Sequence, residues 1–156
     1  MKDMVKILFI CHGNICRSPM AEFIMKDLVE KAEVADRFEI ASAATSAEEL
    51  GNPVYPPARR MLAEHGLRCA GKTARQMTRR DYDQWDYLIG MERYNLRNMQ
   101  RITGGDPEGK MHLLLSFSGS GGDIEDPWYS GDFAGVYRQI EEGCHSLLIY
   151  LTEKNN

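Results

Sequence analysis

The stretch VKILFICHGNICRSP, residues 5–19, decides the fold because it predicts a strand, a loop and a helix in immediate succession. Val5–Ile10 is an apolar, β-branched-rich run with the length of a buried strand. Ser18 and Pro19 open a helical pattern, with Ser18 placed to cap the helix and Pro19 suited to its first position. Such a unit directs backbone N–H groups and the positive end of a helix at one point. The stretch therefore predicts a binding site for an anion.

Cys11 and Arg17 add reactive groups to this loop in the pattern Cys-x5-Arg. A cysteine at a helix N-terminus beside a guanidinium favours the thiolate form, which is a nucleophile. The planar guanidinium matches two oxygens of a phosphate group. Gly13 and Asn14 tolerate the positive φ angles that a loop curled round a ligand requires. An isolated cysteine and arginine would predict a buried strand end and a surface charge, but the flanking signals favour nucleophilic attack on a bound oxyanion.

Strands and helices alternate along the rest of the chain, which predicts an α/β fold with a parallel sheet covered on both faces. We expect strands over Val5–Ile10, Phe38–Ala44, Tyr87–Met91 and Lys110–Phe117. We expect helices over Met20–Ala32, Ala58–His65, Arg79–Gln84, Glu92–Arg101 and, capped by Asp132, from Phe133 to Leu151. Parallel sheets bind ligands at the carboxyl ends of their strands, and Cys11 lies at such an end.

Composition excludes several classes of protein. The chain has 156 residues, 43% hydrophobic and 27% charged, which is typical of one soluble domain over residues 1–156. Its net charge of −4 does not indicate a surface that binds nucleic acid. Neither a membrane segment nor a signal peptide is predicted, so we expect a cytoplasmic location. In that compartment free thiols are expected at all four cysteines: Cys11, Cys16, Cys69 and Cys144.

The segment Cys11–Pro19, CHGNICRSP, resembles the phosphate-binding loop of the low-molecular-weight protein tyrosine phosphatases. The resemblance is specific, because it includes the Gly-Asn pair, the second cysteine and the Ser-Pro pair. It extends over nearly the whole chain. It implies a four-stranded parallel sheet with helices on both faces.

A hydrolase built on Cys11 and Arg17 also needs an acid to protonate the leaving oxygen. Asp126 is our candidate, since Gly-rich residues precede it and Pro127 follows it. The family has its general acid in an Asp-Pro-aromatic-aromatic loop, which Asp126–Tyr129 resembles. Alone, Asp-Pro predicts only a turn. The local competitors for the acid role are Asp123, Glu125 and Asp132.

The resemblance implies hydrolysis of phosphotyrosine in proteins or peptides, and of aryl phosphates, through a phosphocysteine. Cys11 would attack phosphorus, Arg17 would bind the phosphate and stabilise the transition state, and Asp126 would act as general acid and then as base. No metal or other cofactor is required, and phosphate-like anions should bind the loop. The further substrate-binding candidates are His12, Gly13, Asn14, Ile15, Cys16, Ser18, Glu48, Trp128 and Tyr129.

Some of these candidates have two interpretations. Trp128 and Tyr129 would line a cleft deep enough for an aromatic ring, or pack in the core. Cys16 would form a reversible disulfide with Cys11 that protects it from overoxidation, or fill buried space. Ser18 can hold the thiolate by a hydrogen bond as well as cap the helix. In the family, the position of Asn14 stabilises the loop from within, and Ser42 lies where a strand-end partner is expected.

Three parts of the chain depart from the family pattern. His12 replaces an apolar or small residue, which places a titrating group beside the pocket. Lys72 replaces a histidine in a His-x-Ala-Arg segment, which puts that histidine's support of the loop in doubt. Glu48 and Glu49 make a variable cleft wall acidic, so substrates with acidic residues beside the phosphotyrosine should bind less well.

The same residues bear on alternative functions. Thiol-coupled arsenate reductases need two further cysteines close in sequence, whereas Cys69 and Cys144 are far apart. Protein-arginine phosphatases have Thr where Ile15 stands, so Ile15 favours phosphotyrosine. A non-catalytic phosphate-binding module would tend to lose the nucleophile or the acid. The cysteines lack a second pair at zinc-ligand spacing, which argues against a zinc site. The segment GGDPEGK, residues 104–110, matches a nucleotide-binding loop, but Met111 stands where Ser or Thr would bind magnesium, so we interpret it as a turn.

Overall fold

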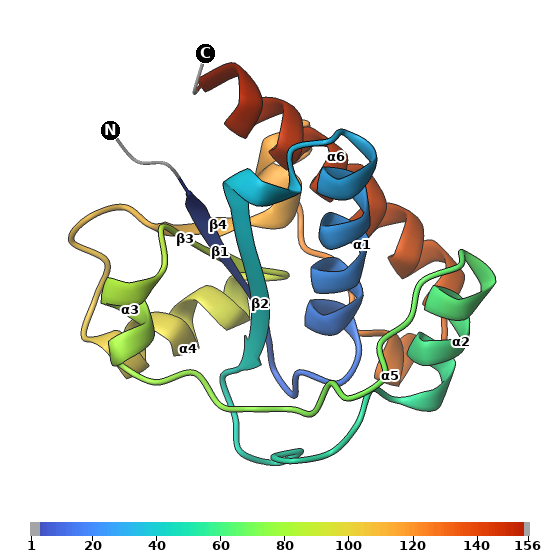
Figure 1. The fold of residues 1–156 in the computed structure, drawn as a ribbon. Helices are drawn as coiled ribbons and strands as arrows, with labels where there is room; N and C mark the ends of the chain where they lie inside the picture. Colours follow the sequence, from blue (N-terminus) through green and yellow to red (C-terminus); the bar gives the residue numbers. More distant parts are fainter. Residues whose placement is uncertain (1–3, 155–156) are drawn as a thin grey trace.

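The computed structural model describes residues 4–154. Its strands are all parallel and form one sheet in the order β2-β1-β3-β4 (Figure 1). Their bounds are β1 (Val5–Cys11), β2 (Phe38–Ala44), β3 (Tyr87–Gly90) and β4 (Met111–Leu113). The α/β class and the four-stranded parallel sheet are thus confirmed.

Strand β1 lies in the middle of the sheet, paired with β2 on one side and β3 on the other. Ile7 to Ile10 are fully buried, as a strand covered on both faces requires. Ile7 and Phe9 point to one face, and Leu8 and Ile10 point to the other, where they join separate hydrophobic clusters. The strand ends at Cys11, which therefore lies at the carboxyl edge of the sheet.

Helices cover both faces of this sheet (Figure 1). One face carries α1 (Arg17–Lys31), α2 (Pro56–Glu64) and α6 (Phe133–Lys154). The other carries α3 (Arg80–Gln84) and α4 (Arg93–Thr103). Shorter helices are η1 (Ala35–Arg37), η2 (Leu114–Ser118) and α5 (Pro127–Ser130). Within residues 4–154, no helix has both the length and the apolar character needed to cross a bilayer.

Two local predictions about helix caps have different outcomes. Helix α1 begins at Arg17, so Ser18 is its second residue and Pro19 its third, and no side chain caps it. The predicted Ser18 cap is therefore wrong, because its hydroxyl lies 3.0 Å from the sulfur of Cys11. The Asp132 cap is confirmed, since its Oδ1 accepts the backbone N–H of Gly135 at 2.9 Å.

The fourth strand is shorter than the predicted Lys110–Phe117. Strand β4 ends at Leu113 and the chain turns into η2, whose residues Leu114 and Leu115 are buried. A Cβ atom at Gly143 of α6 would lie 2.6 Å from Cγ of Leu114, so this glycine allows η2 to approach the helix. Packing against α6, which the local pattern does not encode, replaces the rest of the strand. The remaining predicted elements are confirmed, with ends shifted by a few residues.

Candidate active site

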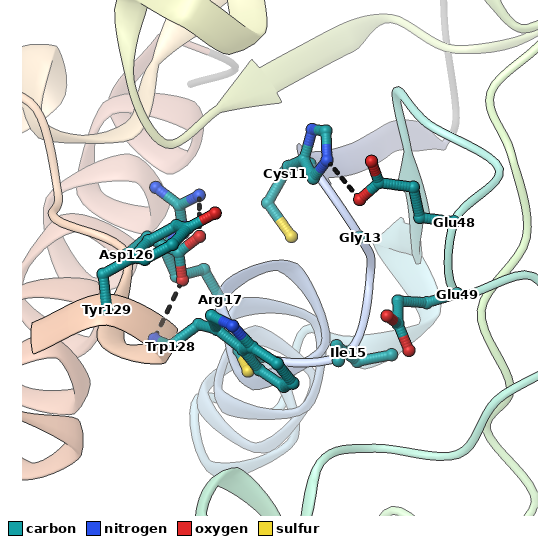
Figure 2. A pocket seen from close by; sticks show the side chains of 11 residues that line it. Cys11, Gly13, Ile15, Arg17, Glu48, Glu49, Asp126, Trp128 and Tyr129 are labelled. Atoms are coloured by element: carbon teal, nitrogen blue, oxygen red, sulfur yellow. Dashed lines mark hydrogen bonds and ion pairs between the residues drawn. The ribbon is translucent and has the colours of Figure 1, made fainter. Parts of the chain in front are cut away.

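A cavity of about 130 Å³ opens at the carboxyl end of β1 (Figure 2). Figure 2 shows the sulfur of Cys11 between two walls that come from segments distant in the sequence. Glu48 and Glu49, from the loop after β2, form one wall. The opposite wall contains Asp126, Trp128 and Tyr129, and the Cys11–Arg17 loop contributes the remaining lining residues His12, Gly13, Ile15 and Cys16.

Three polar groups converge on the sulfur of Cys11, which is only 3% exposed. The backbone N–H groups of Asn14 and Ser18 point at Sγ over 3.3 Å and 3.4 Å. The hydroxyl of Ser18 lies 3.0 Å from the same atom. Donors gathered on a sulfur stabilise its anionic form, so this arrangement favours a thiolate nucleophile.

Asn14 holds the Cys11–Arg17 loop from below. Its φ of 60° is left-handed, a conformation that asparagine tolerates better than most residues. Its side-chain amide donates to the hydroxyls of Ser18 at 2.7 Å and Ser42 at 2.9 Å. Its Oδ1 accepts the backbone N–H of Arg75 at 3.2 Å. Asn14 and Ser18 are thus buried under the loop and, unlike the other predicted site residues, do not line the cavity.

Lys72 and Glu22 extend this network. The Ser42 hydroxyl donates to Oε1 of Glu22 at 2.5 Å. The ammonium group of Lys72 donates to the backbone oxygen of Ser42 at 3.0 Å and lies 3.2 Å from Glu22 Oε1. Burial lowers the pKa of Lys72, against the opposing attraction of Glu22. The lysine that departs from the family pattern is therefore part of the network beneath the loop.

Arg17 is the first residue of α1 and is 2% exposed. Its guanidinium donates to the carboxylate of Glu92 and, at 2.8 Å, to the backbone oxygen of Ile124. Its second terminal nitrogen lies 3.5 Å from Oδ2 of Asp126. Burial acts to lower the pKa of Arg17, but the attraction of Cys11 and its carboxylate neighbours raises it overall. The side chain is thus a fixed cation at the cavity.

Asp126 caps the short helix α5, with Oδ1 accepting the backbone N–H of Trp128 at 3.0 Å. Its other oxygen faces Arg17 (Figure 2). The competing carboxylates lie elsewhere: Asp123 accepts the backbone N–H of Arg93, and Asp132 caps α6. With Glu125, these two residues line a separate hollow. Of the four carboxylates considered, Asp126 alone lines the cavity of Cys11.

Trp128 and Tyr129 lie at the rim of the cavity, 50% and 86% exposed. The interpretation that they pack in the core is therefore wrong. The Trp128 ring is held by Tyr55, whose ring centroid lies 4.7 Å away. On the other wall, Nε2 of His12 lies 2.8 Å from Oε2 of Glu48, so the side chain of His12 joins the loop to the acidic wall.

Cys16 also lines the cavity, although it is only 5% exposed. Burial, together with the charges of Cys11 and Asp126, raises the pKa of its thiol far above the usual range. Both cysteines are free thiols, and the disulfide between them stays a prediction. No cluster of three or more side chains suited to a metal ion is found within residues 4–154.

Sequence reasoning missed Glu22, Tyr55 and the hydrogen bond from Arg75. Glu22 carried a usable signal, because it follows Ser18 by four residues and so lies on the same face of α1. Tyr55 gave no such signal, and Arg75 was marked only as the end of the segment that resembles His-x-Ala-Arg. Their contacts depend on loops that meet only in the folded chain.

Comparison with known proteins finds relatives that match nearly the whole chain. A family model described as low molecular weight phosphotyrosine protein phosphatase matches residues 6–156. The low molecular weight protein-tyrosine-phosphatase YfkJ of Bacillus subtilis is 35% identical over 147 residues, covering 93% of this chain and 94% of that protein. A crystal structure of YfkJ gives a TM-score of 0.95 at 33% identity, covering 98% of each chain.

Two further relatives bear on substrate class. The low molecular weight phosphotyrosine protein phosphatase of Rattus norvegicus is 39% identical over 147 residues, covering 91% of this chain and 92% of that protein. The crystal structure of the Drosophila arginine phosphatase gives a TM-score of 0.85 at 33% identity, covering 94% of this chain and 98% of that one.

Proposed function

Because the chain belongs to the low molecular weight phosphotyrosine protein phosphatase family and is an enzyme of this type, we propose that it cleaves phosphotyrosine through a phosphocysteine on Cys11. The main support is the convergence of three polar groups on the Cys11 sulfur. Arg17 and Asp126 face the same cavity as that sulfur. A nucleophile, an anion-binding cation and an acid are thus within reach of one phosphate group.

In the first step, the phosphate of the substrate binds the N–H groups of the Cys11–Arg17 loop and the guanidinium of Arg17. It displaces Asp126 from Arg17, while Glu92 and the Ile124 carbonyl keep the guanidinium in place. The thiolate attacks phosphorus and the bond to the tyrosyl oxygen breaks. Asp126 gives its proton to that oxygen, so the phenol leaves neutral.

In the second step, a water molecule attacks the phosphocysteine. The carboxylate of Asp126 takes a proton from this water, its oxygen bonds to phosphorus, and the sulfur–phosphorus bond breaks. Inorganic phosphate leaves and the Cys11 thiolate is restored. The polar groups that stabilise the resting thiolate also make it a good leaving group here.

The rim of the cavity supports an aryl substrate. Exposed Trp128 and Tyr129 offer flat apolar faces to a tyrosyl ring, whereas a short aliphatic ester would leave them uncovered. Phosphoarginine is the second candidate substrate, on the likeness to the Drosophila arginine phosphatase. Ile15, which lines the cavity, distinguishes this chain from the threonine-containing loop of that class.

The test compares hydrolysis of phosphotyrosine, phosphoserine and phosphoarginine by the wild type and by Cys11→Ser. We expect the wild type alone to release phosphate, and from phosphotyrosine above the other two. Preferred cleavage of phosphoarginine would replace the proposed substrate with the second candidate. Full activity of Cys11→Ser would contradict the proposed nucleophile.

The acid role has its own prediction. Asp126→Ala should lower kcat for phosphotyrosine by roughly 10²–10⁴, the range for loss of general acid–base catalysis. Asp123→Asn is the matched control, because Asp123 belongs to the same loop but lies outside the cavity. Equal losses in both variants would show that the loop's position, and not the proton of Asp126, had been disturbed.

A further inference from the structure

A second hollow next to the active-site cavity lies on the far side of His12 and differs from the hollow lined by Asp123 and Asp132. It has a volume of about 240 Å³, and the active-site cavity has about 130 Å³. His12 lines both. The second hollow therefore has room for a group the size of phosphate, and only one side chain separates the two. Its other lining residues are Thr45, Ser46, Tyr94, Asn98, Arg101 and Ile102.

Two residues that line this hollow each contain a buried polar atom without a hydrogen-bond partner. These atoms are Nδ1 of His12 and Oγ1 of Thr45, and the part of the chain that the structure describes supplies neither with a partner. Thr45 is only 8% exposed. An unpaired buried polar group costs free energy, so a ligand that bonds with these atoms would recover it.

The charge of the hollow points to an anionic ligand. Helix α4 places Arg93, Arg97 and Arg101 four residues apart, so all three lie along one side of it. Arg93 pairs with Asp123, but no carboxylate lies within 4 Å of Arg97 or Arg101 among residues 4–154. Like charges at this spacing repel each other, and of the three arginines Arg101 lines the hollow, so an anion bound there would offset the repulsion that Arg101 experiences.

His12 connects this hollow with the active site. Its Nε2 is 2.8 Å from a carboxylate oxygen of Glu48, which can only accept, so Nε2 carries a hydrogen. When the ring is an imidazolium, Nδ1–H is a second donor on its other edge. An oxyanion in the hollow and the carboxylate of Glu48 would then each accept one N–H of the same ring.

From these features we propose that the hollow between the end of β2 and α4 is a second binding site for a phosphate group, with Arg101 and Thr45 as its donors and Nδ1–H of His12 as a third donor in the imidazolium form. The phosphate group is either free or carried by the protein substrate on a second phosphorylated residue. The site is separate from Cys11, so its first test reads binding alone. The second test reads KM for phosphotyrosine peptides and therefore also rests on the proposed function.

The first experiment titrates the isotope-labelled wild type with inorganic phosphate and follows individual amides by NMR. The backbone amide of Thr45 and the side-chain N–H of Arg101 should respond with one midpoint, and the amides of Asn14 and Ser18 with another. Arg101→Gln should weaken the first response about tenfold or more, as expected for a lost charge-assisted contact, and leave the second unchanged. Arg37→Gln, at the opposite end of β2, makes the same change of charge and should alter neither response.

The second experiment distinguishes the two sources of phosphate. It compares a peptide with one phosphotyrosine and a peptide with phosphotyrosine plus a nearby phosphoserine. A lower KM for the second peptide, lost in Arg101→Gln but kept in Arg37→Gln, supports a phosphate carried by the substrate. Equal KM values together with the NMR response support a free anion.

Thr45→Val provides a variant that keeps the shape of the side chain. It should lower the affinity of the second response without lowering stability, because the hydroxyl it removes has no partner. The proposal is overturned if Thr45 and Asn14 titrate with a single midpoint in the wild type and Arg101→Gln changes nothing.

Discussion

The charge of Glu22 fixes the direction of the hydrogen bonds beneath the Cys11–Arg17 loop. Its carboxylate can only accept, so the hydroxyl of Ser42 is the donor of the 2.5 Å bond between them. The Ser42 oxygen then accepts the next bond, which the Asn14 side-chain amide donates. The carbonyl of that amide accepts from Arg75, so the amide cannot reverse without losing this bond.

The fixed hydrogen-bond directions extend to Cys11, the nucleophile. The Asn14 amide also donates to the oxygen of Ser18, at 2.7 Å. Since that oxygen accepts from Asn14, its own hydrogen is free for the Cys11 sulfur 3.0 Å away. A negative charge on Glu22 thus favours the arrangement in which Ser18 donates to a thiolate.

Lys72 pairs with the buried carboxylate of Glu22, so this ion pair should contribute to the stability of the fold. Lys72→Met should lower the free energy of unfolding by about 1–3 kcal/mol, because Glu22 loses a buried partner. Lys26→Met is the matched control: Lys26 also pairs with Glu22, but its side chain is 45% exposed, so the loss should stay below about 1 kcal/mol. Urea unfolding measures both, and equal losses would contradict a special role for Lys72.

Glu48 carries a prediction about substrate preference. Glu48→Lys should raise kcat/KM for phosphotyrosine peptides with an acidic neighbour by a few-fold, which is the size of an exposed charge–charge effect. Glu39→Lys, near the other end of β2, makes the same charge change away from the cavity. An unchanged preference in Glu48→Lys would count against an acidic wall that selects substrates.

Among the elements, α3 is tied to the active site through Asp81. This carboxylate accepts from both terminal nitrogens of Arg75, at 3.1 and 3.0 Å, and from the backbone N–H of Thr78 and the indole of Trp85. Arg75 in turn donates its backbone N–H to Asn14. The buried carboxylate of Asp81 therefore connects α3, through Arg75, with the Cys11–Arg17 loop.

Asp81 should make the free energy of unfolding depend on pH. Burial acts to raise its pKa, but the hydrogen bonds from Arg75, Thr78 and Trp85 lower it overall. The folded state thus binds this proton less readily than the unfolded state. The stabilisation is complete above the ordinary aspartate pKa of about 4 and is lost as pH falls through the lower, folded-state value.

Asp81→Asn tests this dependence. Near neutral pH it should be clearly less stable than the wild type, and the difference should shrink in acid as the wild type loses its advantage. Asp83→Asn, an exposed change on the same helix, should follow the wild-type pH curve. A difference between the wild type and Asp81→Asn that stays constant with pH would contradict the linkage.

Elements that depend on residue spacing within one segment could be predicted from the sequence, and elements that depend on contacts between distant segments could not. The strand and helix around Cys11 and the long helix α6 were predictable, since apolar spacing within each segment matches its burial. The end of β4 was not, because η2 forms where Leu114 meets Gly143 of a distant helix. Local sequence cannot encode a contact between segments that far apart.

The residues of the candidate site also fall into those that the sequence indicated and those that only the fold brings together. The types and spacing of Cys11 and Arg17 were informative alone, and Asp126 was informative beside them. The sequence favoured Asp126 over Asp123, Glu125 and Asp132 through its Gly-rich approach and the resemblance of Asp126–Tyr129 to the family's acid loop. The fold adds that Asp126 faces Arg17, whereas Asp123 and Asp132 accept backbone N–H groups elsewhere. The ion pair of Glu22 and Lys72 joins α1 to a loop beyond α2, so it emerges only in the folded chain.

At the scale of the molecule, the carboxyl edge of the sheet joins most of the chain to the active site. The Cys11–Arg17 loop contacts β2 through Ser42, the start of α4 through Glu92 and the loop before α5 through Ile124. A ligand bound there interacts only with the folded chain, because the donors lie together only after folding. Phosphate should therefore stabilise the whole fold, by about 2.7 kcal/mol at one hundred times its dissociation constant.

This stabilisation is best measured in the Arg101→Gln background, which removes the proposed second site. Thermal unfolding with increasing phosphate should raise Tm steadily, and adding Arg17→Gln should remove most of the rise because the fixed cation of the cavity is lost. Adding Arg37→Gln instead should leave the rise intact, since that arginine lies at the amino end of β2. If Tm rose equally in both double variants, phosphate would be acting on the surface charge of the protein, and the cavity of Cys11 would not be its principal site.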